Sequence, residues 1–247
     1  MKLLVCVSKA PDTTSKISFT DNDTAFDESG IQFIMNPYDE WYALVRAIEL
    51  KEQAGEGTVT IVNVGPASND VIIRKGLAIG ADDAARIDMD PKSALSTAQQ
   101  LAAFAKEGGY DIIFLGKETI DYNGAEVGSM LAELLDMPYV SFATKLDVAG
   151  NTATVSRDIE GGTEVAELET PFVISAAKGL AEQRIPNMRG IMMAKRKPLN
   201  VVAPVEVTEL IKVVKFELPG EKSAVKMVDP ENMDELVRLL HEEAKVI

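Results

Sequence analysis

The chain has 247 residues, of which 46% are hydrophobic and 26% charged, a composition typical of a globular α/β domain with appended segments. Its formal net charge of −14, from 39 acidic and 25 basic residues, excludes a delocalised nucleic-acid surface, because phosphate binding needs a basic footprint. The single cysteine, Cys6, excludes a disulfide framework and a cysteine metal cluster, and fits a reducing compartment. No segment approaches the ~20 apolar residues of a membrane span and the apolar start is too short for a secretory signal, so we expect a cytoplasmic protein.

Apolar runs rich in β-branched residues alternate with helical segments along the first part of the chain. The runs that predict strands are residues 3–7, 58–64, 85–88, 111–115 and 139–142. The segments that predict crossover helices are residues 38–54, 68–79, 93–107 and 123–136, with Gly80 and Gly108 as stop signals. This alternation predicts a doubly wound, mostly parallel, Rossmann-like α/β sheet that is covered by helices on both faces.

After Phe142 the pattern changes. Short alternating runs at 152–157 and 164–169 predict an antiparallel hairpin, and the apolar run 172–176 could return to the sheet. From Lys178 onward the chain is basic, then punctuated by prolines, and ends in an amphipathic acidic helix from about residue 230 to 245. We expect one domain followed by a long arm.

Segment 34–40 reads as a helix start. Asn36 is a good N-cap, Pro37 suits the first helical position, and Asp39 and Glu40 complement the helix dipole. Capping therefore explains every polar residue here. Capping does not explain Tyr38, and an aromatic side chain at the start of a helix could face a ligand.

Loop 114–124 follows a predicted strand and leads toward a predicted helix. In open α/β sheets ligands bind beyond the carboxyl ends of strands, and free N–H groups at a helix start favour phosphate. The loop offers close backbone approach, hydrogen bonds and charge through Gly116, Thr119, Asn123 and Lys117. It matches neither the Walker pattern nor GxGxxG, so it is either a nucleotide loop or an ordinary polar connection.

Residues 184–197 carry five bases and no acid in an otherwise acidic chain. Three methionines and two isoleucines lie between these bases, and Met is an adaptable residue at binding surfaces. The segment is either a docking loop for an acidic partner or a short amphipathic helix with a solvated basic end.

The chain offers few catalytic groups. Its one histidine, His241, falls in the predicted C-terminal helix, and there is neither a nucleophile elbow nor a metal-ligand spacing. Cys6 looks like a small core residue. We therefore expect no catalytic residues and no metal, and a nucleotide pocket beside a docking loop would suit a carrier.

Four blocks of the chain together resemble the beta subunit of electron transfer flavoproteins, and the resemblance covers essentially the whole length. The blocks are residues 7–12, the Met35-Asn36-Pro37-Tyr38 helix entry, Leu115-Gly116-Lys117 with Ile120-Asp121, and residues 155–162 continued by 184–198. The last block ends in Ile191-Met192-Met193-Ala194-Lys195-Arg196-Lys197-Pro198 and is close to a family signature.

The resemblance implies a heterodimer in which a large alpha subunit carries most of the FAD site and this subunit holds a structural AMP. By position, the AMP pocket takes in Val7, Asn36, Pro37, Tyr38, Asp39, Val64, Gly116, Lys117, Thr119, Ile120, Asp121, Asn123, Gly124 and Val127. Residues 1–177 would form the nucleotide-binding domain, 178–198 a partner-recognition loop with a short helix, and 199–247 an arm and helix that wrap the partner subunit.

The family role is electron transport rather than enzymatic catalysis. Electrons would come from acyl-CoA dehydrogenases of fatty acid beta-oxidation and related flavin dehydrogenases, and would pass to a quinone oxidoreductase. Tyr38 and Thr13 match two neighbours of the flavin ring, the second of which is often aromatic. Asp158 falls where the family commonly has a glutamate that pairs with an arginine of the large subunit. The docking residues would be Met188, at an anchor position usually held by leucine, with Arg184, Arg189, Ile191, Lys195, Arg196 and Lys197.

Two alternatives remain at this point. Electron-bifurcating relatives hold a second FAD in place of AMP, and their loop typically reads Gly-Asp-Thr-Ala-Gln where this chain has Tyr122-Asn123-Gly124-Ala125-Glu126. Because the threonine is missing, AMP is favoured. A stand-alone adenine-nucleotide-binding or ATP-cleaving protein on a similar sheet would need a metal or a phosphate-activating group, which the sequence does not offer.

Overall fold

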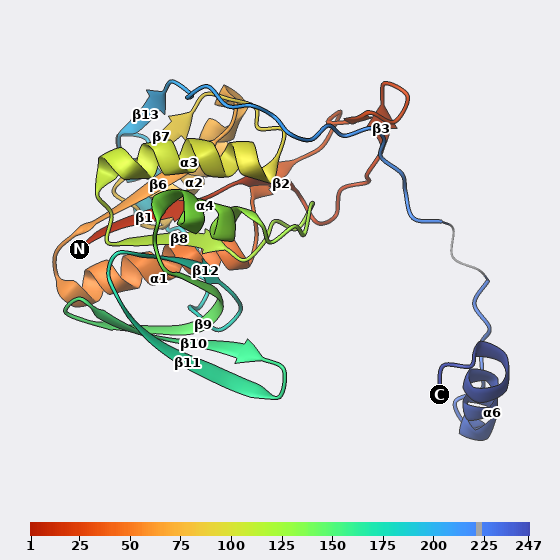
Figure 1. Cartoon of the computed structure of the whole chain (residues 1–247). Coiled ribbons are helices and arrows are strands. Elements are labelled where there is room, and N and C mark those ends of the chain that lie inside the picture. Colours follow the sequence, from red (N-terminus) through yellow and green to blue (C-terminus); the bar gives the residue numbers. More distant parts are fainter. Residues whose placement is uncertain (221–223) are drawn as a thin grey trace. The chain divides into compact units, whose positions relative to one another are not determined.

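The computed structural model describes residues 1–220 and 224–247 (Figure 1). The chain divides into two units, one formed by Met1–Ser18 with Asp27–Val214 and the other by Phe19–Phe26 with Lys215–Ile247. Among the described residues, no helix is both long enough and apolar enough to cross a membrane.

The first unit is built on a sheet of nine strands. They are β1 (Lys2–Cys6), β6 (Thr58–Val64), β7 (Asp83–Ile87), β8 (Ile112–Gly116), β9 (Tyr139–Ala149), β10 (Thr152–Ile159), β11 (Gly162–Glu169), β12 (Phe172–Ala176) and β13 (Leu199–Val202). Their order is β11-β10-β9-β12-β8-β1-β6-β7-β13. Only β10 runs antiparallel to its two neighbours, and all other pairs are parallel. The predicted fold class, the hairpin and the return of β12 to the sheet are confirmed.

Helices cover both faces of this sheet (Figure 1). They are α1 (Asp39–Ala54), α2 (Asp70–Ile79) after a 3-10 turn η1 (Ala67–Asn69), α3 (Ala94–Gly108), α4 (Val127–Leu135) and α5 (Met188–Ala194). Along β1, Leu3 and Val5 join the core that contains α1 and α2, whereas Leu4 and Cys6 join the core that contains α3 and α4. Burial on both faces explains why the strands read as continuous apolar runs.

Some details of the sheet and its helices differ from the sequence prediction. Helix α4 begins at Val127 and not at Asn123, because Asn123 and Ala125 have φ of 51° and 53°, which a right-handed helix does not allow. Helix α3 includes Gly108, and the left-handed residue that ends it is Gly109. Strand β13, which pairs in parallel with β7, was not predicted.

Shorter elements complete the first unit. Strands β2 (Lys9–Pro11) and β5 (Phe33–Met35) pair antiparallel between β1 and α1 in the chain. After β13 the chain continues beside α3, where the Gln100 amide donates to the Val205 carbonyl at 2.7 Å and accepts from the Val205 N–H at 2.9 Å.

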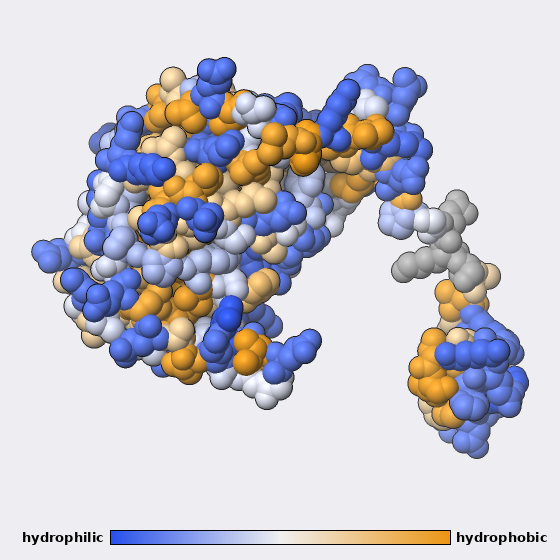
Figure 2. Space-filling view, in the orientation of Figure 1, coloured by the Kyte–Doolittle hydropathy of each residue, from blue (hydrophilic) through white to orange (hydrophobic). Residues whose placement is uncertain are grey.

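The second unit contains the hairpin of β3 (Phe19–Thr20) and β4 (Ala25–Phe26). Phe216 stacks on Phe19 with ring centroids 5.2 Å apart, and its N–H donates to the Asp23 carbonyl at 2.7 Å. The C-terminal helix comprises α6 (Met233–Arg238) and the π-helical η2 (Leu239–Ala244). It has an apolar side and a polar side (Figure 2), as the sequence predicted.

Candidate functional site

The carboxyl ends of three neighbouring parallel strands meet at one edge of the sheet. Val7 follows β1, Val64 ends β6 and Gly116 ends β8, with β1 in the middle. The chain passes from β1 to β6 on one side, and β8 lies on the other side, so the strand order reverses at this point. Open α/β sheets bind ligands at such a switch point. The fold therefore brings three of the expected pocket residues to the edge where a ligand would bind.

Buried polar side chains hold the ends of β1 and β6. The Asn63 Nδ2 donates to the Val7 carbonyl at 2.8 Å, and the Asn63 Oδ1 accepts from the Asn69 Nδ2 at 3.0 Å. Arg86 donates to the Gly65 carbonyl at 2.9 Å. These bonds fix the turn after β6 before any ligand binds.

Asn36 connects the start of α1 to the loop after β8. Its side chain is completely buried, with the Nδ2 donating to the Glu118 carbonyl and the Oδ1 accepting from the Ile120 N–H, both at 3.0 Å. Both polar groups of the amide are thus engaged within the chain. Asn36 holds the loop in shape.

The start of α1 differs from the sequence prediction. The helix begins at Asp39, its N-cap position is Tyr38, and no side chain caps it. The prediction that Asn36 caps the helix and Pro37 begins it is wrong, because the Asn36 amide is bound to a loop far away in the sequence. Tyr38 has φ of 63° and ψ of −95°, a strained conformation for a bulky residue, and its side chain is 60% exposed.

Glu40 joins the ends of β1 and β8. Its buried carboxylate accepts from the Ser8 N–H at 2.7 Å and from the Ser8 hydroxyl at 2.6 Å. Gly116 lies against the same residue, since a Cβ added there would be 2.8 Å from the Glu40 Cγ and 3.0 Å from its backbone nitrogen. Only glycine allows β8 and α1 to approach this closely.

Two carboxyl groups at this edge have raised pKa values. Burial raises the pKa of Glu40 to about 8, against the two Ser8 hydrogen bonds, which favour the carboxylate. Burial also raises the pKa of Asp39 to about 6, although the nearby Lys117 ammonium opposes this. Protonation near neutral pH lowers the negative charge at the start of α1.

The loop before α4 has an irregular backbone, in which the Asn123 N–H donates to the Thr119 carbonyl at 2.9 Å. Asn123 and Ala125 are left-handed, and alternation of left-handed with other residues turns successive N–H groups toward one side. Helix α4 has no side-chain cap, and its first internal bond runs from the Met130 N–H to the Glu126 carbonyl. The N–H groups at the first turn of α4 therefore precede the helical ladder and can bind an anion.

The other expected pocket residues lie on this loop or at its ends. Lys117, Thr119 and Ile120 are partly buried, Asp121, Asn123 and Gly124 are exposed, and Val127 is the first residue of α4. The Lys117 ammonium lies 3.1 Å from the Glu118 carboxylate and 5.9 Å from the centre of the Phe142 ring. Thr13 is exposed in the turn that follows β2.

The basic segment forms helix α5, which is fixed to α2. Lys197 donates to the carbonyls of Leu77, at 3.0 Å, and Ala81 at the end of α2. In return, Arg74 donates to the carbonyls of Ala194 and Lys197 at 2.7 and 2.6 Å. Arg74 of α2 thus satisfies carbonyls at and just after the end of α5, and Lys197, which follows α5, satisfies carbonyls at and just after the end of α2.

The bases of this segment have different environments. Arg184 makes a bidentate ion pair with Glu52, at 2.8 and 3.0 Å, and its carbonyl accepts from the Trp41 Nε1 at 3.1 Å. Arg189, Lys195 and Arg196 are exposed.

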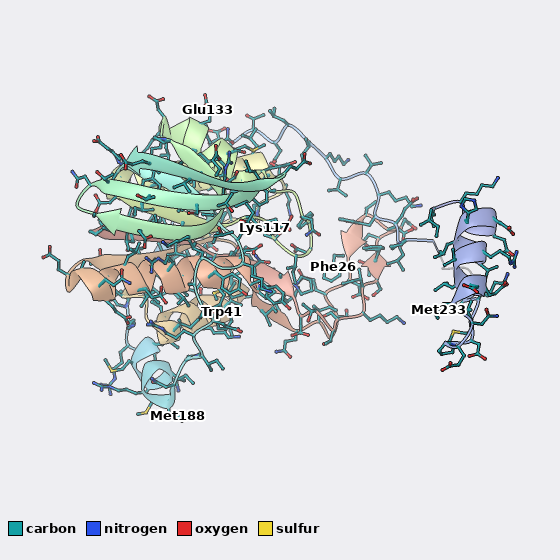
Figure 3. All side chains as sticks on the ribbon, turned by 90° about the horizontal axis from the view of Figure 1, so that it is seen from below. Phe26, Trp41, Lys117, Glu133, Met188 and Met233 are labelled. Carbon is teal, nitrogen blue, oxygen red and sulfur yellow. The ribbon has the colours of Figure 1, made fainter. Side chains whose placement is uncertain are left out.

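Met188 begins α5, is 74% exposed and points away from α1 (Figure 3). Ile191, Met192 and Met193 are also exposed. Asp158 is exposed on β10, distant in the chain from the loop 114–124 and from α5.

Comparison with known proteins identifies the family. The family described as "Electron transfer flavoprotein domain" matches residues 23–207. The "Electron transfer flavoprotein subunit beta" of Bacillus subtilis (strain 168) is 37% identical over 264 residues, with 100% of both chains covered. The protein of the same description from Homo sapiens is 32% identical over 255 residues, covering 100% of this chain and 99% of its own. This chain belongs to the electron transfer flavoprotein beta-subunit family.

As an electron transfer flavoprotein beta subunit, the chain is an electron carrier subunit of a flavin-associated protein and not an independent enzyme. This confirms the family and the carrier role that the sequence predicted.

Several residues that shape this beta subunit were missed by the sequence analysis. Ser8, Asn63 and Arg86 hold the strand ends, and Arg74 holds α5. Each bonds to a backbone group or carboxylate that is distant in the sequence, so no local pattern marks it. For Asn63 and Arg86, a polar residue inside an apolar strand is a signal, because such groups need partners when they are buried.

Proposed function

We propose that this beta subunit binds AMP at the carboxyl ends of β1, β6 and β8. The observation that carries the proposal is the left-handed loop at Asn123 and Ala125, which leads directly into the uncapped start of α4. Such an arrangement of N–H groups suits a phosphate. The adenosine would lie over Val7 and Val64.

The pocket would be shaped before AMP arrives. Because Asn36 bonds to residues 118 and 120, we assign it to positioning the loop and not to direct contact through its amide. Glu40 and Gly116 would set the distance between α1 and the loop. A pre-formed loop reduces the ordering cost of binding.

FAD would lie at the interface with an alpha subunit that carries most of its site. When bound, the flavin supplies the electron-carrying chemistry. Tyr38, exposed on a strained turn, would present its ring to the flavin, and Thr13 would be a second, non-aromatic neighbour. Asp158 would pair with an arginine of the alpha subunit. Among the residues that the structure describes, its carboxylate accepts only a long hydrogen bond of 3.5 Å, from Thr163.

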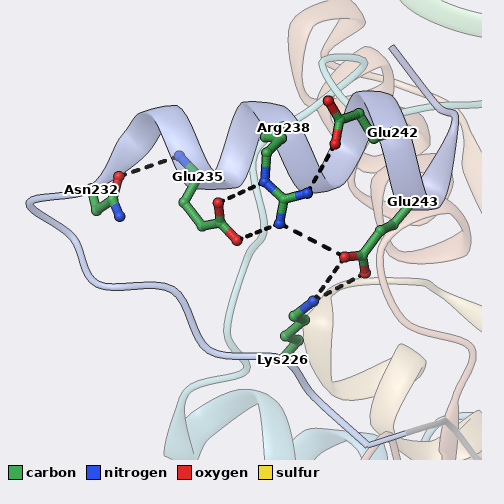
Figure 4. A network of polar contacts seen from close by, with 6 residues as sticks. All are labelled: Lys226, Asn232, Glu235, Arg238, Glu242 and Glu243. Carbon is green, nitrogen blue, oxygen red and sulfur yellow. Dashed lines mark hydrogen bonds and ion pairs between the residues drawn. The ribbon is translucent and has the colours of Figure 1, made fainter.

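The C-terminal segment supports the proposal of an arm around the alpha subunit. Residues after β13 expose aliphatic side chains at Leu210, Ile211 and Val214, with exposed fractions of 73%, 63% and 80%. In the C-terminal helix, Arg238 pairs with Glu235 and Glu242, which makes one side strongly polar (Figure 4). The opposite side exposes Met233 and Val237, which a partner could cover.

Electrons would reach the flavin from docked dehydrogenases, including acyl-CoA dehydrogenases, and would leave to a quinone oxidoreductase. Met188 is the proposed anchor, because it is apolar, exposed and carried on a helix that Arg74 and Lys197 hold in place. The bases around it suit an acidic partner.

Nucleotide content tests this proposal. We expect a flavin spectrum after co-expression with the alpha subunit and none for this chain alone. Nucleotides released by denaturing the heterodimer should be one FAD and one AMP. Colourless protein in both preparations would refute the flavoprotein role, whereas two flavins without AMP would identify a bifurcating protein.

The anchor is tested by Met188→Ala. Removing a central apolar contact should raise the KM of a dehydrogenase for the heterodimer about 10-fold. The FAD and AMP contents should not change. Met188→Leu keeps size and apolarity and should behave like the wild type. Loss of flavin from Met188→Ala would show that α5 has a structural role instead.

A further inference from the structure

Between α2 and α5 lies a groove of about 410 Å³ that does not belong to the nucleotide edge. Its apolar walls are formed by Val71, Ala78, Ile191 and Ala194, and the side chains of Lys75 and Lys195 also line it. Val71 is 75% exposed, although it is aliphatic and sits on a helix. Burial of such a side chain by a partner is favourable.

The groove has a fixed shape. Gly190 lies so close to α2 that a Cβ there would be 2.3 Å from the Ala78 carbonyl oxygen. Arg74 holds the far end of α5 through two carbonyls. Lys75 lies over the ring of the buried Trp41, with its ammonium 4.8 Å from the ring centre. The two helices therefore form a rigid surface and not a flexible loop.

The charge around the groove is opposite to that of the chain as a whole. The chain has a net charge of −14, yet among the described residues the lining of the groove contains the cations Arg74, Lys75 and Lys195 and no acid. A concave apolar surface with cations beside it complements an apolar side chain on an acidic segment. The net negative charge of the chain opposes approach to an anionic membrane.

We propose that the α2–α5 groove receives an apolar side chain from an acidic surface segment of the electron-donating dehydrogenase. This inference rests on the proposed function and extends it. Docking would then occur in both directions, with Met188 entering the partner and Val71 and Ile191 receiving a side chain from it. The groove would contribute to affinity and would not touch the flavin.

The test uses the FAD-loaded heterodimer with a charge placed in the groove. Val71→Glu should be tolerated by the fold because the side chain is mostly exposed. The new carboxylate would stand where the apolar side chain of the partner binds and would repel the acidic segment that carries it. The KM of an acyl-CoA dehydrogenase for the heterodimer should therefore rise about 10-fold or more. The kcat and the contents of FAD and AMP should stay unchanged. A direct binding measurement with the dehydrogenase should give the same change in Kd.

The control variant is Lys106→Gln. It changes the net charge by the same single unit, but lies on α3, which packs on the opposite face of the sheet. It should retain the wild-type KM. An equal KM for Val71→Glu and Lys106→Gln, with normal wild-type activity, would overturn the proposal for the groove and leave the proposed function standing. A wild-type heterodimer that neither binds nor accepts electrons from the dehydrogenase would overturn the proposed function and the groove together. Binding to phosphatidylserine vesicles that Val71→Glu abolishes would assign the groove to a membrane and also overturn the proposal.

Discussion

Glu40 should make the stability of this chain depend on pH. The residue is 6% exposed, and its carboxyl group bonds to Ser8 just after β1. Burial raises its pKa from the ordinary 4.5 to about 8. Between these two values the folded state keeps a proton that the unfolded state has lost.

The sign follows from this difference. Below pH 4.5 Glu40 is protonated in both states, so its contribution to stability is fully present. As the pH rises toward 8, the free energy of unfolding should fall by up to about 1.4 kcal/mol per pH unit. The total fall in the free energy of unfolding from low to high pH amounts to roughly 5 kcal/mol as an upper limit, and is reached above the pKa of Glu40 in the folded state. Asp39, whose pKa is about 6, adds a smaller effect of the same sign at lower pH.

Glu40→Gln isolates this effect. Glutamine has the shape of the protonated side chain and stays neutral at every pH, so the fall in stability between pH 5 and 8 should become much shallower. The variant should be more stable than the wild type at pH 8.5. Urea denaturation of the purified chain, followed by the fluorescence of Trp41, its single tryptophan, measures this. The exposed Glu133→Gln is the control and should keep the wild-type slope. Parallel pH profiles for Glu40→Gln and the wild type would refute the reasoning.

Two further substitutions test the packing of α5 and the proposed phosphate site. Gly190→Ala places a Cβ 2.3 Å from the Ala78 carbonyl oxygen, so α5 must move away from α2, at a cost of about 1–3 kcal/mol. The thermal midpoint should fall and Trp41 fluorescence should change, and an unaltered protein would show that the two helices do not pack this tightly. Glu126 is exposed just before α4, and its charge would repel a phosphate bound there. Glu126→Gln should tighten AMP binding to the nucleotide-free heterodimer roughly 2–5-fold at low salt and less at high salt, as measured by calorimetry, and an unchanged Kd would place the phosphate elsewhere.

Local patterns were sufficient for the sheet and most of its helices. Strands buried on both faces must be continuously apolar, and the crossover helices between them have recognisable lengths and stop signals, so the parallel α/β core could be predicted without tertiary information. The edge at which we propose a ligand could also be located, because the ends of β1, β6 and β8 are defined once the strands are known. The resemblance to the family then suggested a nucleotide as that ligand.

The sequence by itself could not determine how the polar residues are used. Asn36 reads locally as a helix cap, yet Glu118 and Ile120 take both of its amide groups. Lys197 reads as a docking base, yet its ammonium is bound to the carbonyls at the end of α2. Hydrogen bonds of this kind join residues more than 80 positions apart, so only the folded chain decides which partner a polar group finds. Composition and periodicity therefore determine where the core lies, and tertiary contacts determine which polar side chains remain available for a ligand or a partner.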